Sequence, residues 1–280
     1  MNISGSEAVI KSLLKENVNT IFGYPGGAIM PIYDALYNYV NKISHILTRH
    51  EQGAIHAAQG YARVSGKTGV CFATSGPGAT NLITGLNDAL IDSTPIVCIT
   101  GQVPSNLLGT DAFQESDVIG ISMPVTKWNH QITNSSEIVE ILSKAFYIAR
   151  SGRPGPVLID ITKDAQFSKT SFRYKKCEKI RSYHPYPVLK SKEINDAAKI
   201  INQAKKPLIL VGQGVLLSKA ENELIKFSEI TGIPLASTLL GLSAVSCDHK
   251  NYVGYLGMHG NYGPNVKTNE ADLILSLIHI

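Results

Sequence analysis

The sequence has no apolar run long enough to cross a membrane. A spanning helix needs about 18 or more consecutive apolar residues, and no stretch of this chain reaches that length. Residues 1–7 also lack the basic segment and the apolar core with which a secretory signal peptide begins. We therefore expect a cytoplasmic protein with no membrane partner.

Cysteine is scarce, and the cysteines lie far apart. The 280 residues contain four, Cys71, Cys98, Cys177 and Cys247, and none belongs to a C-x-x-C pair. Cys71 and Cys98 fall inside apolar runs, which is typical of buried free thiols. This spacing argues against a disulfide framework and against a metal site.

Positive charge is concentrated in one part of the chain. The whole chain carries a formal charge of +4, but residues 163–206 contain twelve Lys and Arg against four Asp and Glu, which gives +8 there and −4 elsewhere. A basic stretch can bind nucleic acid. Its aromatic residues, however, occur together with Pro185 and Pro187, as in a solvated linker. We therefore predict a basic linker over residues 164–190 and no nucleic-acid partner.

The order of strands and helices predicts an α/β fold with parallel sheets. A chain of 280 residues exceeds what one core usually covers, so we expect two domains. In the first, residues 1–163, helical patterns alternate with apolar strand-like runs. The expected strands are 20–22, 43–47, 68–74, 95–100 and 157–161, and the expected helices are 4–17, 29–40, 51–62, 79–91 and 135–150.

The second expected domain, residues 191–280, shows the same alternation. Its expected elements are a helix at 191–204, a strand at 207–211, a helix at 218–231 and strands at 233–236 and 271–277. A parallel sheet needs both faces covered, and no helix follows the last of these strands. We therefore expect a partial central domain.

Segments rich in glycine follow several of the expected strands. Three glycines occur within residues 23–27, Thr74-Ser75-Gly76-Pro77-Gly78 ends one strand, and a long polar connection at 105–120 follows the next. Ligands of open parallel sheets bind beyond the carboxyl ends of the strands, so we expect the site there. Residues 74–78 match neither G-x-G-x-x-G nor G-x-x-x-x-G-K-[ST], which argues against dinucleotide-binding and P-loop sites.

Glu51 is the strongest candidate for a catalytic residue. It begins a helix in which Ala54, Ala57, Ala58 and Gly60 would let a backbone or a flat ligand approach closely. An acidic residue in a first helical turn is also favoured by the helix dipole, whatever the function. Taken alone, this segment therefore favours tight helix packing over a site.

Six motifs occur in order along the chain. They are Phe22-Gly23-Tyr24-Pro25-Gly26-Gly27, His50-Glu51-Gln52, Thr74-Ser75-Gly76-Pro77-Gly78, Gly101-Gln102-Val103-Pro104, Thr110-Asp111-Ala112-Phe113-Gln114-Glu115 and Leu256-Gly257-Met258-His259-Gly260. Together they resemble the catalytic large subunit of acetohydroxyacid synthase, also called acetolactate synthase, as far as about Leu275. The resemblance implies a pyrimidine-binding domain for thiamine diphosphate, followed by a central domain for FAD. It also implies that the family's third domain, which holds the diphosphate and Mg²⁺, is absent from this sequence.

The resemblance assigns roles to residues of the first domain. Glu51 matches the glutamate that hydrogen-bonds the aminopyrimidine ring, where a carboxyl group can favour the imino tautomer. Phe113 and Gln114 match residues at the reacting centre, and Lys163 matches a lysine near the substrate entrance. The rest of the predicted thiamine diphosphate pocket consists of Tyr24, Pro25, Gly26, Thr74, Gly78 and Asn81.

The resemblance also implies an FAD site. Arg153 matches an arginine that contacts FAD, although an arginine in such a turn is otherwise a solvent-exposed residue. His259, between two glycines, would otherwise be an ordinary loop histidine. The predicted FAD residues of the second domain are Gly212, Gly214, Thr238, Leu239, Met258 and His259.

Two features depart from the family pattern. Asn106 stands in a loop where some relatives have a basic residue, which leaves substrate and inhibitor preferences open. Residues 277–280 abandon the family's continuation into a glycine-containing turn. This departure favours a truncated or misread gene.

The implied activity condenses two pyruvates, or pyruvate and 2-oxobutanoate, with loss of carbon dioxide in branched-chain amino-acid biosynthesis. The resemblance also implies a homodimer, with the Glu51 helix at its interface, and a small regulatory subunit; we expect the chain as written to be inactive alone. Another thiamine diphosphate-dependent 2-oxo acid decarboxylase or oxidase is an alternative, although residues 110–115 favour the synthase. A non-catalytic fragment is the alternative from a different class.

Overall fold

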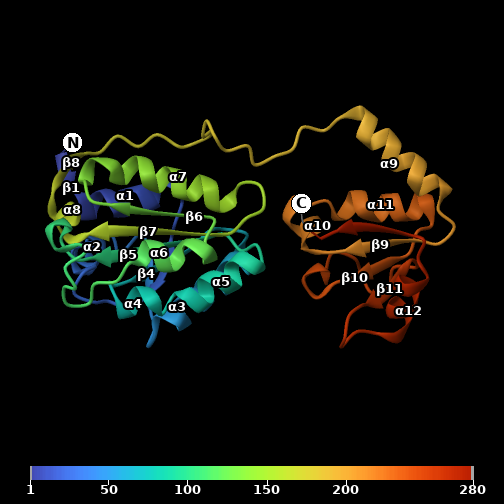
Figure 1. Cartoon of the computed structure of the whole chain (residues 1–280), viewed down its shortest axis with the longest axis horizontal. Coiled ribbons are helices and arrows are strands. Elements are labelled where there is room, and N and C mark those ends of the chain that lie inside the picture. The colour runs from blue at the N-terminus through green and yellow to red at the C-terminus, as the bar shows by residue number, and fades with distance from the viewer. Residues whose placement is uncertain (1, 279–280) are drawn as a thin grey trace. The chain divides into compact units, whose positions relative to one another are not determined.

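The protein consists of two compact units (Figure 1). A computed structural model describes residues 2–278. The chain divides into a first unit, Met1–Tyr186, and a second unit, Pro187–Ile280. Within the described residues, no helix combines the length and the apolar character needed to cross a membrane. Of the departure expected at 277–280, residues 279 and 280 lie outside the described part of the chain.

The first unit is built on a six-stranded parallel sheet with the order β3-β2-β4-β5-β7-β6. Its strands are β2 (Thr20–Gly23), β3 (Ser44–Leu47), β4 (Gly69–Ala73), β5 (Ile96–Gln102), β6 (Trp128–Ile132) and β7 (Pro156–Thr162). Five of them lie where apolar runs predicted strands. We did not predict β6, because this edge strand is largely polar and only Ile132 of it is fully buried.

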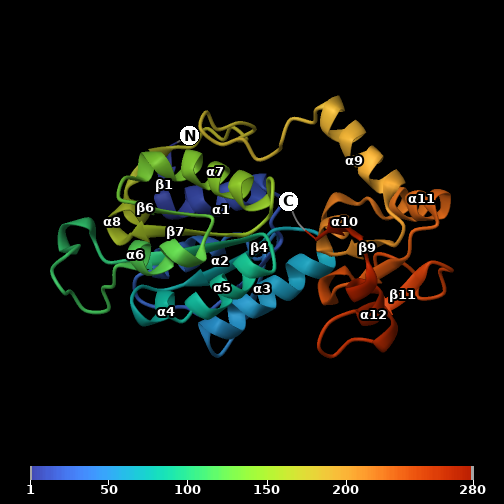
Figure 2. The same cartoon turned by 45° about the vertical axis from the view of Figure 1, so that its right-hand side comes forward.

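Helices cover both faces of this sheet (Figures 1 and 2). One face carries α1 (Gly5–Lys15), α2 (Met30–Tyr37), α7 (Ile138–Arg150) and α8 (Lys163–Phe167); the other carries α3 (Glu51–Ser65), α4 (Pro77–Thr80), α5 (Ile83–Ile91) and α6 (Val118–Ser122). Short 3-10 turns, η1 (Ser105–Leu107), η2 (Met123–Val125) and η3 (Ser135–Glu137), lie in the connections. Each face has its own apolar cluster, as a parallel sheet requires.

Much of the segment expected to be a linker, residues 164–190, folds onto the first unit. After α8, β8 (Lys169–Ser171) pairs antiparallel with β1 (Asn2–Ser4). Phe172, Tyr174 and Ile180 then pack against the apolar cluster. Apolar and basic side chains alternate here, so the segment can bury one set and leave the other in water. The observed division between the units therefore falls near the end of the expected linker.

The second unit has a four-stranded parallel sheet with the order β11-β10-β9-β12. Its elements are α9 (Ser191–Gln203), β9 (Pro207–Val211), α10 (Gln213–Ser218), α11 (Glu221–Thr231), β10 (Leu235–Ser237), η4 (Leu239–Gly241), β11 (Tyr252–Tyr255), α12 (Tyr262–Glu270) and β12 (Leu273–Leu277). We predicted neither β11, which is only partly buried and contains Gly254 at a φ of 113°, nor α12. The last strand, β12, lies at the sheet edge, and Ile274 on it is 44% exposed.

Candidate functional site

In the first unit the order of the strands reverses beside β2. The chain runs from β2 to β3 on one side and then returns to β4 on the other side of β2. Ligands of open parallel sheets bind in the crevice outside the carboxyl ends at such a point. Tyr24 and Pro25 follow β2 directly, and Thr74 follows β4. The sheet therefore places these predicted pocket residues at the expected binding edge.

Glu51 lies at the N-terminus of α3, and Asn81 holds one of its two carboxylate oxygens. The preceding residue, His50, caps the helix by accepting a hydrogen bond at Nδ1 from the N–H of Gln52 (3.1 Å). Glu51 is only 7% exposed, and its Oε2 accepts a hydrogen bond from Nδ2 of Asn81 (2.9 Å). Within residues 2–278, Oε1 has no hydrogen-bond partner. This oxygen is available to an N–H group of a ligand.

The side chain of Thr74 lies against both Gly26 and Gly78. Its Oγ1 accepts a hydrogen bond from the N–H of Ala28 (3.2 Å). A Cβ on Gly26 would lie 2.5 Å from Cβ of Thr74, and a Cβ on Gly78 would lie 2.7 Å from its Cγ2 and 3.2 Å from Oε1 of Glu51. Both positions therefore need glycine, because the loops after β2 and β4 and the Glu51 carboxylate approach closely here.

The loop that carries Phe113 and Gln114 rests on Gly76. A Cβ on Gly76, whose φ is 53°, would lie 2.5 Å from the carbonyl oxygen of Gln114, which itself has a φ of 58°. The backbone of Gln114 thus contacts the loop that follows β4. The ring of Phe113 is 88% exposed, so this apolar side chain has little contact within the described residues.

Glu115 braces the same loop from within. Its carboxylate accepts hydrogen bonds from the backbone N–H groups of Gly109, Thr110 (3.3 Å) and Ala112 (3.1 Å). These bonds, the one from Gly109 first, hold the pKa of Glu115 below its ordinary value. Hydrogen bonds within the loop therefore fix its backbone conformation.

Lys163 begins α8, directly after β7, and is half-buried. Its neighbour Asp164 accepts hydrogen bonds from the backbone N–H (2.9 Å) and the hydroxyl (2.6 Å) of Ser105, at the start of the same loop. Burial raises the pKa of Asp164, but hydrogen bonds from Ser105, Thr162 and its own backbone N–H together outweigh it, so the pKa lies below its ordinary value. The position of Lys163 is thus coupled to that of the loop.

The alanines of α3 pack within the first unit. Ala54, Ala58 and Ala62 are buried in the apolar cluster on that face, and a Cβ on Gly69 would lie 2.4 Å from the carbonyl oxygen of Ala58. The close approach expected of the small residues of α3 therefore serves packing within the unit, with Ala58 against β4, and a contact of this helix with a second subunit stays a prediction. Gly60, in contrast, is exposed and faces open space.

Arg153 holds the C-terminal end of α5. Its Nε donates to Oγ of Ser93 (2.8 Å), and Nη2 donates to the carbonyls of Ile91 (2.9 Å) and Leu90 (3.4 Å). The last carbonyls of a helix have no partner within the helix, and a cation stabilises them. The guanidinium therefore has a structural role in the first unit, and its contact with FAD stays a prediction.

The predicted FAD residues of the second unit lie at the carboxyl edge of its sheet. The strand order reverses between β9 and β12, and Gly212 directly follows β9. A Cβ on Gly212 would lie 2.4 Å from Cα of Ile278, and the N–H of Gly214 donates to the carbonyl of Ile278 (2.6 Å). The two glycines therefore accommodate the chain that leaves β12. At the same edge are Thr238, which caps η4, and the exposed side chains of Leu239, Met258 and His259.

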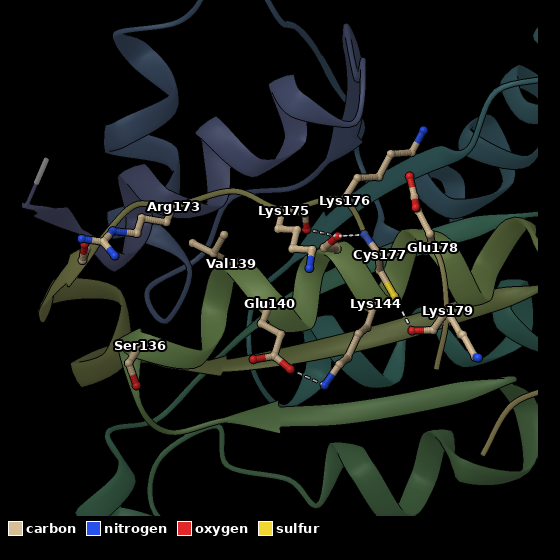
Figure 3. A pocket seen from close by; sticks show the side chains of 12 residues that line it. Ser136, Val139, Glu140, Lys144, Arg173, Lys175, Lys176, Cys177, Glu178 and Lys179 are labelled. Carbon is tan, nitrogen blue, oxygen red and sulfur yellow. Dashed lines mark hydrogen bonds and ion pairs between the residues drawn. The ribbon is translucent and has the colours of Figure 1, made fainter. Parts of the chain in front are cut away.

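A hollow of about 590 Å³ elsewhere on the first unit contains none of the predicted site residues. It lies between α7 and the segment 171–179 (Figure 3). Its lining consists of Ser136, Val139, Glu140, Ser143, Lys144, Ser171, Arg173, Lys175, Lys176, Cys177, Glu178 and Lys179. In the described part of the chain, no group of three or more His, Cys, Asp or Glu is placed to hold a metal ion.

Asp160 is a buried carboxyl group that we did not select from the sequence. It lies in β7, is 0% exposed, and accepts hydrogen bonds from Thr100, Gln102 and Gln131. Burial raises the pKa of Asp160 above its ordinary value, although these hydrogen bonds act in the opposite direction. Asp160 is the only charged residue in β7. A charged residue within an apolar run was the sequence feature that could have revealed it.

Comparison with known proteins identifies two domains. Residues 3–121 match the family model of the thiamine pyrophosphate enzyme N-terminal TPP binding domain, and residues 194–277 match that of the thiamine pyrophosphate enzyme central domain. The acetolactate synthase large subunit of Corynebacterium glutamicum is 48% identical over 275 residues, which are 98% of this chain and 44% of that protein. The isozyme 2 large subunit of Escherichia coli K12 is also 48% identical over 275 residues, 98% of this chain and 49% of that protein. The chain thus spans about half the length of these relatives.

Proposed function

Because this chain belongs to the thiamine pyrophosphate enzymes, we propose that it is the part of an acetolactate synthase large subunit that binds the aminopyrimidine end of thiamine diphosphate. The observation that carries the proposal is the nearly buried Glu51 carboxylate, which has one oxygen fixed by Asn81 and the other available. The whole protein would condense two pyruvates, or pyruvate and 2-oxobutanoate, with loss of carbon dioxide.

The residues beside Glu51 fit an aminopyrimidine ring. Oε1 of Glu51 can share a proton with a ring nitrogen, while the Asn81 amide prevents the carboxylate from turning away. Gly78 lets the loop after β4 approach this oxygen closely, and Gly26 lets the loop after β2 approach Thr74. Tyr24, 42% exposed at the same sheet edge, offers an apolar ring to a flat ligand.

When bound, thiamine diphosphate supplies the nucleophilic carbon of the reaction. We assign to Glu51 the task of holding a proton against the ring, and to Asn81 the orientation of the carboxylate. Phe113, Gln114 and Lys163 are assigned to the substrate side. The docking of the Gln114 backbone on Gly76 supports this assignment, because it joins the loop to the segment that begins with Thr74.

FAD is proposed as a ligand of the second unit. Exposed Leu239, Met258 and His259 at the carboxyl edge can contact a flat ring. Gly212 and Gly214 fit this role less well, because Ile278 fills the space in front of them. We propose that residues outside the described part of the chain bind Mg²⁺. We also propose that the protein is cytoplasmic and binds a small regulatory subunit, as the resemblance implies.

Product analysis with the full polypeptide that the gene encodes separates the candidate functions. Acetolactate from pyruvate supports the synthase, whereas acetaldehyde or an oxidised product such as acetyl phosphate indicates a related decarboxylase or oxidase. Sequencing the DNA after codon 280 tests the alternative that the protein is a non-catalytic fragment. An open reading frame there with a Gly-Asp-Gly…Asn motif would argue against this alternative.

We propose a homodimer in which the exposed part of α3 faces the second subunit. Gly60→Trp is then expected to convert the dimer to a monomer, because a side chain there enters open space on the unit's own surface and leaves its core intact. Sedimentation analysis measures the mass. Lys144→Trp, at an exposed pair on α7, is the control that should remain dimeric; a Gly60→Trp dimer would contradict the proposal.

The 280 residues expressed by themselves are expected to bind thiamine diphosphate weakly and to leave pyruvate unchanged. They offer Glu51 and nearby loops to the ring, but no described metal-ligating group for the diphosphate and its Mg²⁺. Calorimetric titration with both ligands and a pyruvate assay test this. Micromolar binding together with turnover would show that a diphosphate site exists within these residues.

A further inference from the structure

A buried polar cluster lies beneath the 105–116 loop, which carries the proposed residues of the reacting centre. Asp160 of β7 pairs in register with Thr100 of β5 and Gln131 of β6, so three adjacent strands bring polar side chains together. Oδ1 of Asp160 accepts from the Thr100 hydroxyl (2.6 Å), and Oδ2 accepts from Nε2 of Gln102 (3.0 Å) and of Gln131 (2.9 Å). Burying such a group is costly to the folded state, and these three bonds offset the cost.

Gln102 joins this cluster to the end of the loop. The Nε2 that donates to Asp160 also donates to the backbone carbonyl of Ser116 (3.1 Å), and Oε1 accepts from the N–H of Val103 (2.9 Å). A flipped amide would face Asp160 and Ser116 with an acceptor and Val103 with donors. Asp160 therefore selects the orientation in which Gln102 can hold Ser116. Gln131 makes the same bond to Asp160 but, within residues 2–278, no hydrogen bond to the loop.

The bond from Gln102 to Ser116 matters because, within the described residues, the loop has few other anchors: its start and its middle are each held at one further point. Its first residue, Ser105, is held by Asp164 at the start of α8, and its middle rests on Gly76 through the backbone of Gln114. Gln102 holds the remaining end at Ser116. Releasing that end would let the segment before it move away from Gly76.

We propose that Gln102, oriented by Asp160, is a positioning residue that fixes the 105–116 loop so that Gln114 stays against the segment that begins with Thr74. The inference deepens the proposed function and rests on it, because the loop matters to the reaction only if it carries residues of the reacting centre. Gln102 touches neither the proposed cofactor nor the proposed substrate; it acts through Ser116.

Gln102→Met and Gln131→Met form a matched pair for the test. Each removes one amide donor from the same oxygen of Asp160, but only the first also releases Ser116. In the full polypeptide, Gln102→Met is expected to speed hydrogen exchange of the 105–116 amides by about tenfold or more, the effect of a lost buried hydrogen bond. It should lower kcat for pyruvate similarly, with a smaller change in KM. Gln131→Met should leave both close to the parent.

Equal loop exchange in the two variants, or parent-like exchange in Gln102→Met, overturns the proposal. If Gln102→Met does not fold, Asp160→Asn and Asp160→Leu replace the pair. Asn can still accept from both glutamine amides while its own amide donates to Thr100, so the loop should exchange as in the parent; Leu should release it. Similar exchange in Asn and Leu variants would contradict the orienting role of Asp160.

The two readouts separate this inference from the proposed function. Hydrogen exchange reports on the loop whether or not pyruvate is consumed. A parent without acetolactate formation, combined with selective loop release in Gln102→Met, would refute the function and retain the anchor. Turnover in the parent combined with identical loops in all variants would refute the anchor alone.

Discussion

Replacing Glu51 by Gln in the full polypeptide is expected to lower turnover with pyruvate on the order of 10²-fold or more, the range found for groups that transfer a proton. The change keeps the size of the side chain, and its amide oxygen can still accept the bond from Asn81. What it removes is the ability of Oε1 to hold and release a proton. Steady-state rates measure the effect.

The control for this variant is Glu140→Gln, the same change of carboxylate to amide on the exposed face of α7 (Figure 3). It should leave turnover unchanged. Unfolding followed by the fluorescence of the single tryptophan, Trp128 in β6, reports whether the first unit stays folded. A Glu51→Gln enzyme within a factor of about two of the parent would exclude Glu51 from the reaction.

Replacing Arg150 by Met is expected to lower the free energy of unfolding of the first unit by about 3 kcal/mol. Its guanidinium pairs with Glu16, whose side chain is 2% exposed and also accepts a bond from the Tyr174 hydroxyl. Removing one partner of a buried ion pair leaves an uncompensated charge and costs about 3–5 kcal/mol. The lower value applies because Arg150 itself is 38% exposed and water screens part of the interaction.

Urea unfolding monitored by Trp128 measures this loss. The matched control is Lys144→Met, also on α7, whose ion pair with Glu140 lies in solvent and should contribute about 0.5 kcal/mol or less. Equal destabilisation by the two substitutions would contradict the prediction that the pair between Arg150 and the buried Glu16 stabilises the first unit more than a solvent-exposed pair does.

The strands that form the core of the fold could be predicted, because their side chains repeat a simple pattern. The run at 207–211 gave the bounds of β9, and the capping pair Ser4 and Glu7 marked the start of α1. The edge strand β6 escaped prediction because a strand with one side unpaired need not be apolar. The basic segment after β8 escaped it because its apolar side chains are interspersed with lysines.

The candidate site could be predicted as a set of residues but not as a set of contacts. Gly-rich loops after strands indicated where a ligand would bind, and parallel pairing then brought those loops to one edge. The bond between Glu51 and Asn81 joins residues 30 positions apart, so no local pattern reveals it. Small residues in α3 were compatible with packing inside or outside the unit, and only the fold shows that Ala58 faces β4.

The role of Glu51 is tested most directly by deuterium exchange at the thiazolium C2 position of thiamine diphosphate bound to the full polypeptide. This exchange depends on proton transfer within the bound cofactor and requires no substrate or later step. We expect Glu51→Gln to slow it on the order of 10²-fold, while Glu140→Gln leaves it unchanged. If exchange in Glu51→Gln were as fast as in the parent, with the cofactor shown to be bound, Glu51 would not take part in the proton transfer proposed for it.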